Sequence, residues 1–218
     1  MKYHHAFPQT GFTLIEMIVA LAVFSVVVTM SMGALLTLVG TNQQLQAEQS
    51  VMTNLSFALD SMTREIRTGI RYYCGGTANR NGSVSGYQLF RDNQDLNGMD
   101  EETRDCSDGR DTSPIQGVAF IEGGKSVTGV EGTRIVYFFD EGEHKLYRRV
   151  SNDEAQSIVS SGIYINNAEF YVTGSEPLEE GEETQAAVTI FIEAQDPDDV
   201  TGKLHQIQTT ITQRTLDI

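Results

Sequence analysis

Basic residues are scarce in this chain, which carries 15 Lys and Arg against 30 Asp and Glu and has a formal net charge of −15. A folded domain with this balance repels nucleic acid and anionic lipid surfaces. We therefore expect no nucleic-acid partner.

The residue patterns of common active sites are also missing. Beyond residue 5 the histidines are His144 and His205, which show no zinc-ligand spacing, and there is no nucleophile elbow. The tripeptide Gly124-Lys125-Ser126 resembles the end of a phosphate-binding loop, but Ala119 occupies the position of the required earlier glycine. We expect no catalytic residues, no enzymatic activity and no cofactor, apart from a calcium ion considered below.

Cysteine is limited to Cys74 and Cys106. If this part of the chain lies outside the cytoplasm, an oxidising compartment permits a disulfide between them. By the chain-entropy estimate, an unstrained bridge that closes the loop of about 33 residues from Cys74 to Cys106 contributes roughly 3 to 4 kcal/mol to the free energy of unfolding. We predict a Cys74–Cys106 disulfide.

Charged residues are absent from Met17 to Ala47, and the first part of this stretch is dominated by Val, Leu, Ala, Met and Phe. As a helix, roughly 24 such residues span about 36 Å, which is enough to cross a bilayer core. The run is too long for a secretory signal peptide, and no clear small-residue cleavage site follows it. We predict a transmembrane helix over residues 12–40, and an uncleaved anchor stays open as its role.

Glu16 lies inside the apolar segment that begins at Phe12. A carboxylate in hydrocarbon costs about 2.5 to 3.5 kcal/mol on insertion scales, so such a group usually has a partner. Neither a simple anchor nor a signal peptide supplies that partner.

The residues from Gly11 to Leu21, GFTLIEMIVAL, resemble the signature of type IV pilins and type II secretion pseudopilins. The resemblance implies that a prepilin peptidase removes a leader, residues 1–11, by cutting after Gly11, and that the new terminal residue, Phe12, is methylated. It also implies that Glu16 is an assembly residue. Its partner would be the positively charged amine of Phe12, in the same or a neighbouring subunit, because opposite charges in a low dielectric offset each other's desolvation.

The resemblance places the protein in the inner (cytoplasmic) membrane before assembly. Lys2, His4 and His5 give the leader a positive bias that keeps it in the cytoplasm, so the chain after a single span faces outward. The implied partners are the prepilin peptidase, other pilins or pseudopilins and, indirectly, an assembly ATPase with its membrane platform. Many major pilins carry a proline midway through this helix, whereas this segment offers only Gly33, which favours a minor pilin or pseudopilin.

An amphipathic helix is expected to continue over residues 41–69. Its apolar positions recur at helical spacing and its opposite face is polar, which favours packing on a sheet over a coiled coil. Residues 59–67 resemble the helix end of the pseudopilin J and minor pilin W families, and Thr68-Gly69 supplies a stop. The stripe consists of Leu45, Met52, Leu55, Leu59, Met62 and Ile66, and the opposite face of Gln44, Glu48, Asn54, Asp60 and Arg64.

Short alternating runs occupy residues 70–218. Val188, Ile190 and Ile192 share one face, as in antiparallel strands with one buried side, and residues 140–143 are typical of a hairpin turn. We therefore predict an α+β fold in which a long N-terminal helix packs its C-terminal half on an antiparallel β-sheet domain. The predicted strands are Tyr87–Arg91, Gln116–Glu122, Thr133–Asp140, His144–Val150, Ala168–Thr173, Ala187–Glu193 and His205–Arg214.

The acidic insertion, residues 92–111, has two interpretations. Oxygen ligands at alternate positions followed by Gly98 are typical of a calcium loop, although Arg104 stands where an EF-hand has its bidentate Glu. The alternative is a solvated loop tethered by Cys106. A second acidic run, Glu176–Glu183, is predicted to be an exposed hairpin loop. The candidate calcium ligands are Asn93, Asp95, Asn97, Asp100 and Glu101, with Glu102 or Asp105 as further oxygen donors.

Together these features predict a minor pilin or pseudopilin, a structural subunit of a type IV pilus or of a type II secretion pseudopilus, with a competence pilus as a further variant. The alternative from another class is a membrane-anchored extracellular binding module that never assembles. The two differ at the N-terminus, because the pilin begins with N-methylated Phe12 and the anchor retains Met1.

Overall fold

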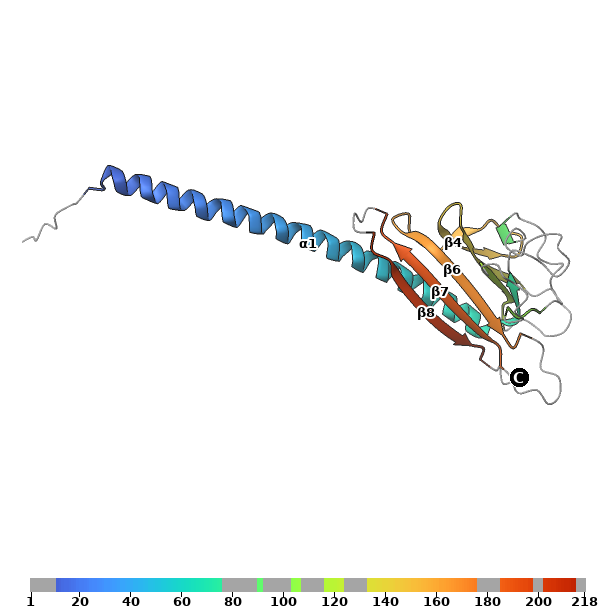
Figure 1. Ribbon diagram of the computed structural model, residues 1–218. Helices are drawn as coiled ribbons and strands as arrows, with labels where there is room; N and C mark the ends of the chain where they lie inside the picture. Colours follow the sequence, from blue (N-terminus) through green and yellow to red (C-terminus); the bar gives the residue numbers. More distant parts are fainter. Residues whose placement is uncertain are drawn as a thin grey trace, which may run out of the picture. The chain divides into compact units, whose positions relative to one another are not determined.

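The computed structural model describes residues 11–75, 90–91, 103–106, 116–123, 133–175, 185–197 and 202–214. Its elements are the helix α1 (Leu14–Thr68) and the strands β1 to β8 (Figure 1). The chain divides into two compact units, Met1–Gln46 and Ala47–Ile218.

The helix α1 runs without interruption for 55 residues. Ser and Thr hydroxyls in its apolar part donate to carbonyls one turn back, as in Ser25 to Leu21 (2.8 Å) and Ser31 to Val27 (2.8 Å). These polar groups are thus satisfied within the helix, as an apolar environment requires. The helix ends at Thr68, and a Cβ atom on the next residue, Gly69, would lie 2.5 Å from the Phe120 ring, so only glycine allows this close approach.

The predicted apolar stripe is correct at Leu55, Met62 and Ile66, which are buried, and wrong at its start. Leu45 and Met52 are 50% and 42% exposed. Met52 lies about 100° round the helix from Val51, because one residue advances a helix by that angle. The buried face therefore consists of Val51, Leu55, Ala58, Met62 and Ile66.

The strands that the structure describes, β1 to β8, form two sheets, and every pairing between these strands is antiparallel. The first sheet has the order β1-β2-β3-β4-β5, and the second has the order β6-β7-β8. The first comprises β1 (Ile70–Gly75), β2 (Gly117–Ile121), β3 (Arg134–Asp140), β4 (Lys145–Val150) and β5 (Gln156–Ser157). The second comprises β6 (Tyr164–Thr173), β7 (Ala187–Gln195) and β8 (His205–Thr212).

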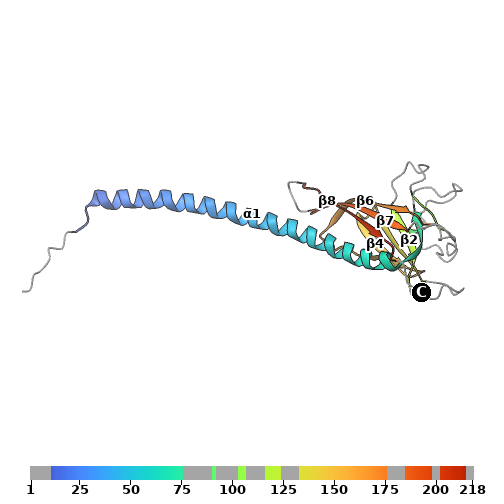
Figure 2. The same cartoon turned by 90° about the horizontal axis from the view of Figure 1, so that it is seen from below.

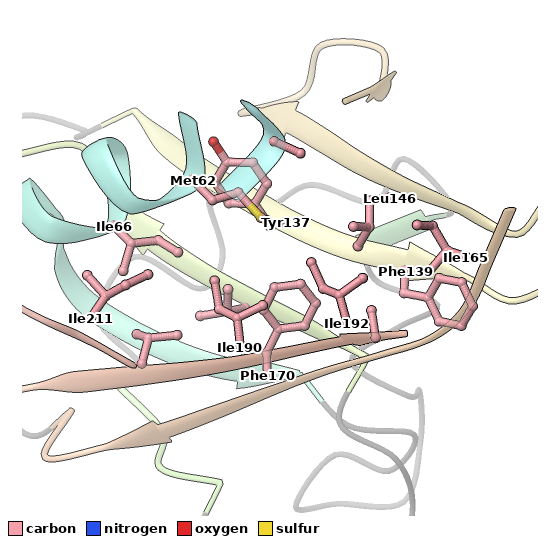
Figure 3. Close-up of a cluster of buried hydrophobic side chains, with 14 of the residues drawn as sticks. Met62, Ile66, Tyr137, Phe139, Leu146, Ile165, Phe170, Ile190, Ile192 and Ile211 are labelled. Carbon is pink, nitrogen blue, oxygen red and sulfur yellow. The ribbon is translucent and has the colours of Figure 1, made fainter. Parts of the chain in front are cut away.

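One hydrophobic core is shared by the C-terminal half of α1 and the inner faces of both sheets. Figure 3 shows Met62 and Ile66 of α1 above Ile190 of β7, with Tyr137 of β3 beside them. Strand β7 alternates between buried and half-buried residues because only one face of its sheet meets this core.

Strand β3, by contrast, is buried at every residue. Its second face packs in a separate apolar cluster that contains Phe90, Val136 and Phe138. A sheet covered on both faces needs no polar alternation, which explains the continuous apolar run in this strand.

The α+β fold class is confirmed, and six of the predicted strands correspond to β2, β3, β4, β6, β7 and β8. The strand predicted at Tyr87–Arg91 is wrong at Phe90 and Arg91, which are helical, while residues 87–89 lie outside the described chain. A run this short defines no period. Phe90 is instead a buried core residue whose carbonyl accepts a hydrogen bond from Arg149 Nη1 (3.1 Å).

Other boundaries differ as well. Strands β1 and β5 were not predicted, and β6 begins at Tyr164, four residues before the predicted start. His144, predicted to begin a strand, is the last residue of the hairpin turn and has a φ of 55°. The turn itself is confirmed, because Asp140 Oδ1 accepts hydrogen bonds from the N–H groups of Gly142 (2.8 Å) and Glu143 (3.1 Å).

Candidate processing and assembly segment

The N-terminal unit exposes a continuous apolar surface. Every described residue from Gly11 to Gln46 is exposed, including Phe12 and Leu14 at 79% each. Among the described residues, α1 is long and apolar enough to cross a membrane. A surface of this kind requires lipid or protein around it, since its exposure to water is unfavourable over the whole length.

The helix begins at a capping arrangement formed by Thr13 and Glu16. Glu16 N donates to Thr13 Oγ1 (3.4 Å), and Met17 N donates to Thr13 O (3.3 Å). Thr13 is thus the N-cap residue and Glu16 the third helical residue, the spacing of a capping box. The carboxylate at this position also opposes the positive end of the helix dipole.

The capping role of Thr13 was missed in the sequence, although the spacing Thr-x-x-Glu before an apolar run signals it. Capping adds a local reason for an acid at position 16. Capping does not supply a cation, because the helix N-terminus carries only a partial positive charge.

The surroundings of Glu16 are otherwise apolar. Its side chain shares a shallow depression on one helix face with Ile15, Val19, Ala20 and Val23. Residues 11–46 contain no Lys, Arg or His. Within this segment, a positive partner for the carboxylate can come only from a free amine at Phe12, created by cleavage, or otherwise from another molecule.

Gly11 and Phe12 precede the helix and are exposed, and a Cβ atom added at Gly11 would meet nothing within 4 Å. The predicted cleavage bond is therefore accessible, and its cleavage would leave the new amine two residues before Leu14, the first residue of α1. The amine and Glu16 would then share one helix end.

The disulfide Cys74–Cys106 is confirmed, with the two Cα atoms 5.4 Å apart. It fixes the segment 103–106 between the two sheets. Arg104 N donates to Tyr72 O of β1 (3.1 Å), and Cys106 N donates to Val172 O of β6 (3.0 Å). This part of the acidic insertion is therefore a structural link between β1 and β6.

Asp105, one of the further oxygen donors proposed for calcium, has a structural role in this link. Its carboxylate accepts hydrogen bonds from Gly174 N (2.9 Å) and Ser175 N (2.8 Å), directly after β6. The described residues contain no cluster of three or more His, Cys, Asp or Glu suited to a metal ion. The five candidate ligands Asn93, Asp95, Asn97, Asp100 and Glu101, like Glu102 and the run Glu176–Glu183, lie outside the described residues, and calcium binding stays a prediction.

The comparison with known families matches this N-terminal segment. Residues 7–32 match the model of the prokaryotic N-terminal methylation motif. No curated protein and no solved structure matches the chain.

The matched residues include Gly11, Phe12, Thr13 and Glu16, and they reach well into the apolar part of α1. The chain thus carries the signature of a type IV pilin-like prepilin. That signature implies processing by a prepilin peptidase and other pilins as partners, and together with the apolar helix it indicates membrane anchoring by a single N-terminal helix.

Proposed function

We propose that this chain is a minor pilin or pseudopilin, a non-enzymatic structural subunit of a type IV pilus or a type II secretion pseudopilus. The peptidase cuts after Gly11 in the inner membrane, and an assembly ATPase with its membrane platform drives the mature subunit into the filament. The exposed apolar helix then exchanges lipid for the helices of neighbouring subunits.

The observation that carries this proposal is the isolation of Glu16. The carboxylate lies on an apolar helix face in a segment without any basic side chain. Capping would serve a simple anchor equally well but leaves the carboxylate without a cation, whereas an assembling subunit gains a charge that must find an amine before burial is favourable. The pair therefore sets the position of one helix against the next.

The experiment compares Glu16→Ala, Glu16→Gln and Thr13→Ala with the wild type. All should be processed to N-methylated Phe12, as read by mass spectrometry of the mature protein. We expect both Glu16 variants to be excluded from filaments, because each lacks the negative charge. Thr13→Ala removes only the cap and should assemble nearly as the wild type does.

Three results would contradict the proposal. Recovery of intact Met1 from membranes that contain an active prepilin peptidase would favour a tethered extracellular binding module. Incorporation of Glu16→Gln at the wild-type level would remove the charge-pairing argument, and equal loss in Thr13→Ala would assign Glu16 to helix capping alone.

A further inference from the structure

Four strands lie at the edges of the two sheets: β1 and β5 in the first, and β6 and β8 in the second. An edge strand presents backbone N–H and C=O groups that can pair with another chain. Proteins therefore shorten, bend, charge or cover such strands.

Three of these edges are protected. Strand β1 has an irregular register between Ile70 and Tyr73 and is covered by the segment 103–106. Strand β5 is only two residues long. Strand β6 has a register shift after Ile165, and its outer side is bonded near both ends, where Ile165 N donates to His144 O (3.0 Å) and Val172 O accepts from Cys106 N (3.0 Å).

The edge of β8 differs, and its outward-facing groups can be identified. Gln213 N donates to Ala186 O (2.8 Å), so the backbone groups of Gln213 point toward β7. In an antiparallel ladder the backbone N–H and C=O groups of successive residues point to opposite sides. Those of the odd-numbered residues of β8 therefore face β7, and those of the even-numbered residues face away from the sheet. Arg214 N fits this phase, because it donates to Arg67 O of α1 (2.8 Å).

The outward-facing residues of β8 are all exposed, and their backbone groups have no partner among the residues that the structure describes. Figure 1 shows β8 as the outermost strand of its sheet, and Figure 2 shows the same strands from below. The outward-facing residues of β8 are Gln206, Gln208, Thr210 and Thr212.

Hydrogen bonds to α1 flank β8, because Lys203 Nζ donates to Glu48 Oε2 (2.8 Å) and Arg214 N donates to Arg67 O (2.8 Å). The strand between Lys203 and Arg214 lacks an acidic or basic charge, a proline and a register shift. Residues 204–213 contain no Asp, Glu, Lys, Arg or Pro, in a chain with a net charge of −15. The register with β7 continues from Ala187↔Thr212 to Ala194↔His205 without a shift. A regular, uncharged edge of this length is suited to accept a further strand.

We propose that the outer edge of β8 pairs with an extended, uncharged backbone segment of a neighbouring pilin-type subunit, which adds a strand to the sheet β6-β7-β8. Only an extended backbone presents donors and acceptors in alternation at the spacing of the free groups of β8. This inference rests on the proposed function, since assembly supplies the neighbouring subunit. It concerns a contact separate from the apolar helix.

The test uses the full-length chain in cells that assemble the filament. Gln208→Pro removes one outward N–H group, and Thr210→Lys places a charge on the edge. Thr189→Lys is the matched control, because Thr189 lies on the central strand β7 and its hydroxyl contacts that of Thr210 (2.9 Å). Control and edge variant therefore lose the same hydroxyl pair.

We expect the two edge variants to enter filaments roughly tenfold less than the wild type, the factor that corresponds to loss of one or two net hydrogen bonds. The control should stay within about twofold, with all three variants melting near the wild-type temperature. Equal incorporation of Thr210→Lys and Thr189→Lys would overturn the inference while leaving the proposed function intact. Failure of the wild type itself to enter filaments would overturn both.

Discussion

Replacing Glu65 should reveal how α1 is held on the first sheet. Glu65 Oε1 accepts a hydrogen bond from Arg148 Nη2 (2.9 Å), and Oε2 accepts from Arg148 Nε (2.9 Å) and from the Tyr137 hydroxyl (2.7 Å). One carboxylate of the helix thus joins β3 and β4. The side chains of Arg148 and Glu65 are 31% and 30% exposed, so solvent screens the pair only in part.

The expected effect of Glu65→Ala follows from these contacts. Hydrogen bonds to charged groups contribute about 1.5 to 3 kcal/mol each, and an abandoned buried hydroxyl costs about 1 to 3 kcal/mol. Water can reach Arg148 after the substitution and lowers the loss, so we expect a decrease of about 2 to 3 kcal/mol in the free energy of unfolding. For a chain of this size, that corresponds to a melting temperature lower by about 4 to 12 °C.

The assay is denaturant unfolding of the full-length chain in detergent, with Arg148→Met and the double variant completing a double-mutant cycle. Arg64→Ala is the control, because Arg64 pairs with Asp60 on the exposed side of the same helix (2.5 Å, side chains 79% and 63% exposed) and should change stability little. If Glu65→Ala unfolds at the wild-type denaturant concentration, or if the cycle shows no coupling between Glu65 and Arg148, the reasoning is refuted.

Reduction of the Cys74–Cys106 disulfide, which spans 32 positions, should destabilise the domain by about 3 to 4 kcal/mol, and melting with and without reductant measures this. Gly123→Ala should destabilise by about 1 to 3 kcal/mol, because its Cβ would lie 1.7 Å from a backbone oxygen, whereas Gly162→Ala meets nothing within 4 Å and should melt as the wild type. Burial and then the Glu65 hydrogen bond raise the pKa of Tyr137, so the folded protein holds this proton more tightly than the unfolded chain. The contribution of this proton to the free energy of unfolding is complete below pH ~10 and should decline above that pH. When unfolding is followed between about pH 9 and 11.5, stability should fall less steeply in Tyr137→Phe than in the wild type.

Several features could be predicted because their signals are local. The apolar run after Phe12, the acid at position 16 and the glycine before them lie within a few residues of one another, and the family match rests on the same stretch. Period-two alternation located β7 and β8 because their sheet has one covered face. The disulfide prediction needed only two cysteines and an oxidising compartment.

Other features depended on which segments meet. The helical conformation of Phe90 and the displacement of Met52 from the core follow from packing partners that no short window contains. Glu65 and Arg148 are 83 positions apart, and each alone reads as an ordinary surface charge. The role of Asp105 in holding the end of β6 is likewise visible only once residue 174 lies beside it.

The sequence by itself determined that this chain carries a prepilin-type signature on an N-terminal helix suited to membrane anchoring, and that its fold is α+β, because hydrophobic periodicity and a compact motif are properties of neighbouring residues. The tertiary structure decided how the strands divide into two sheets, which carboxylate binds the helix to the first sheet and which edge is left open. Those outcomes depend on contacts between residues far apart in the chain, whose pairing is selected by the packing of the whole domain and not by any local pattern.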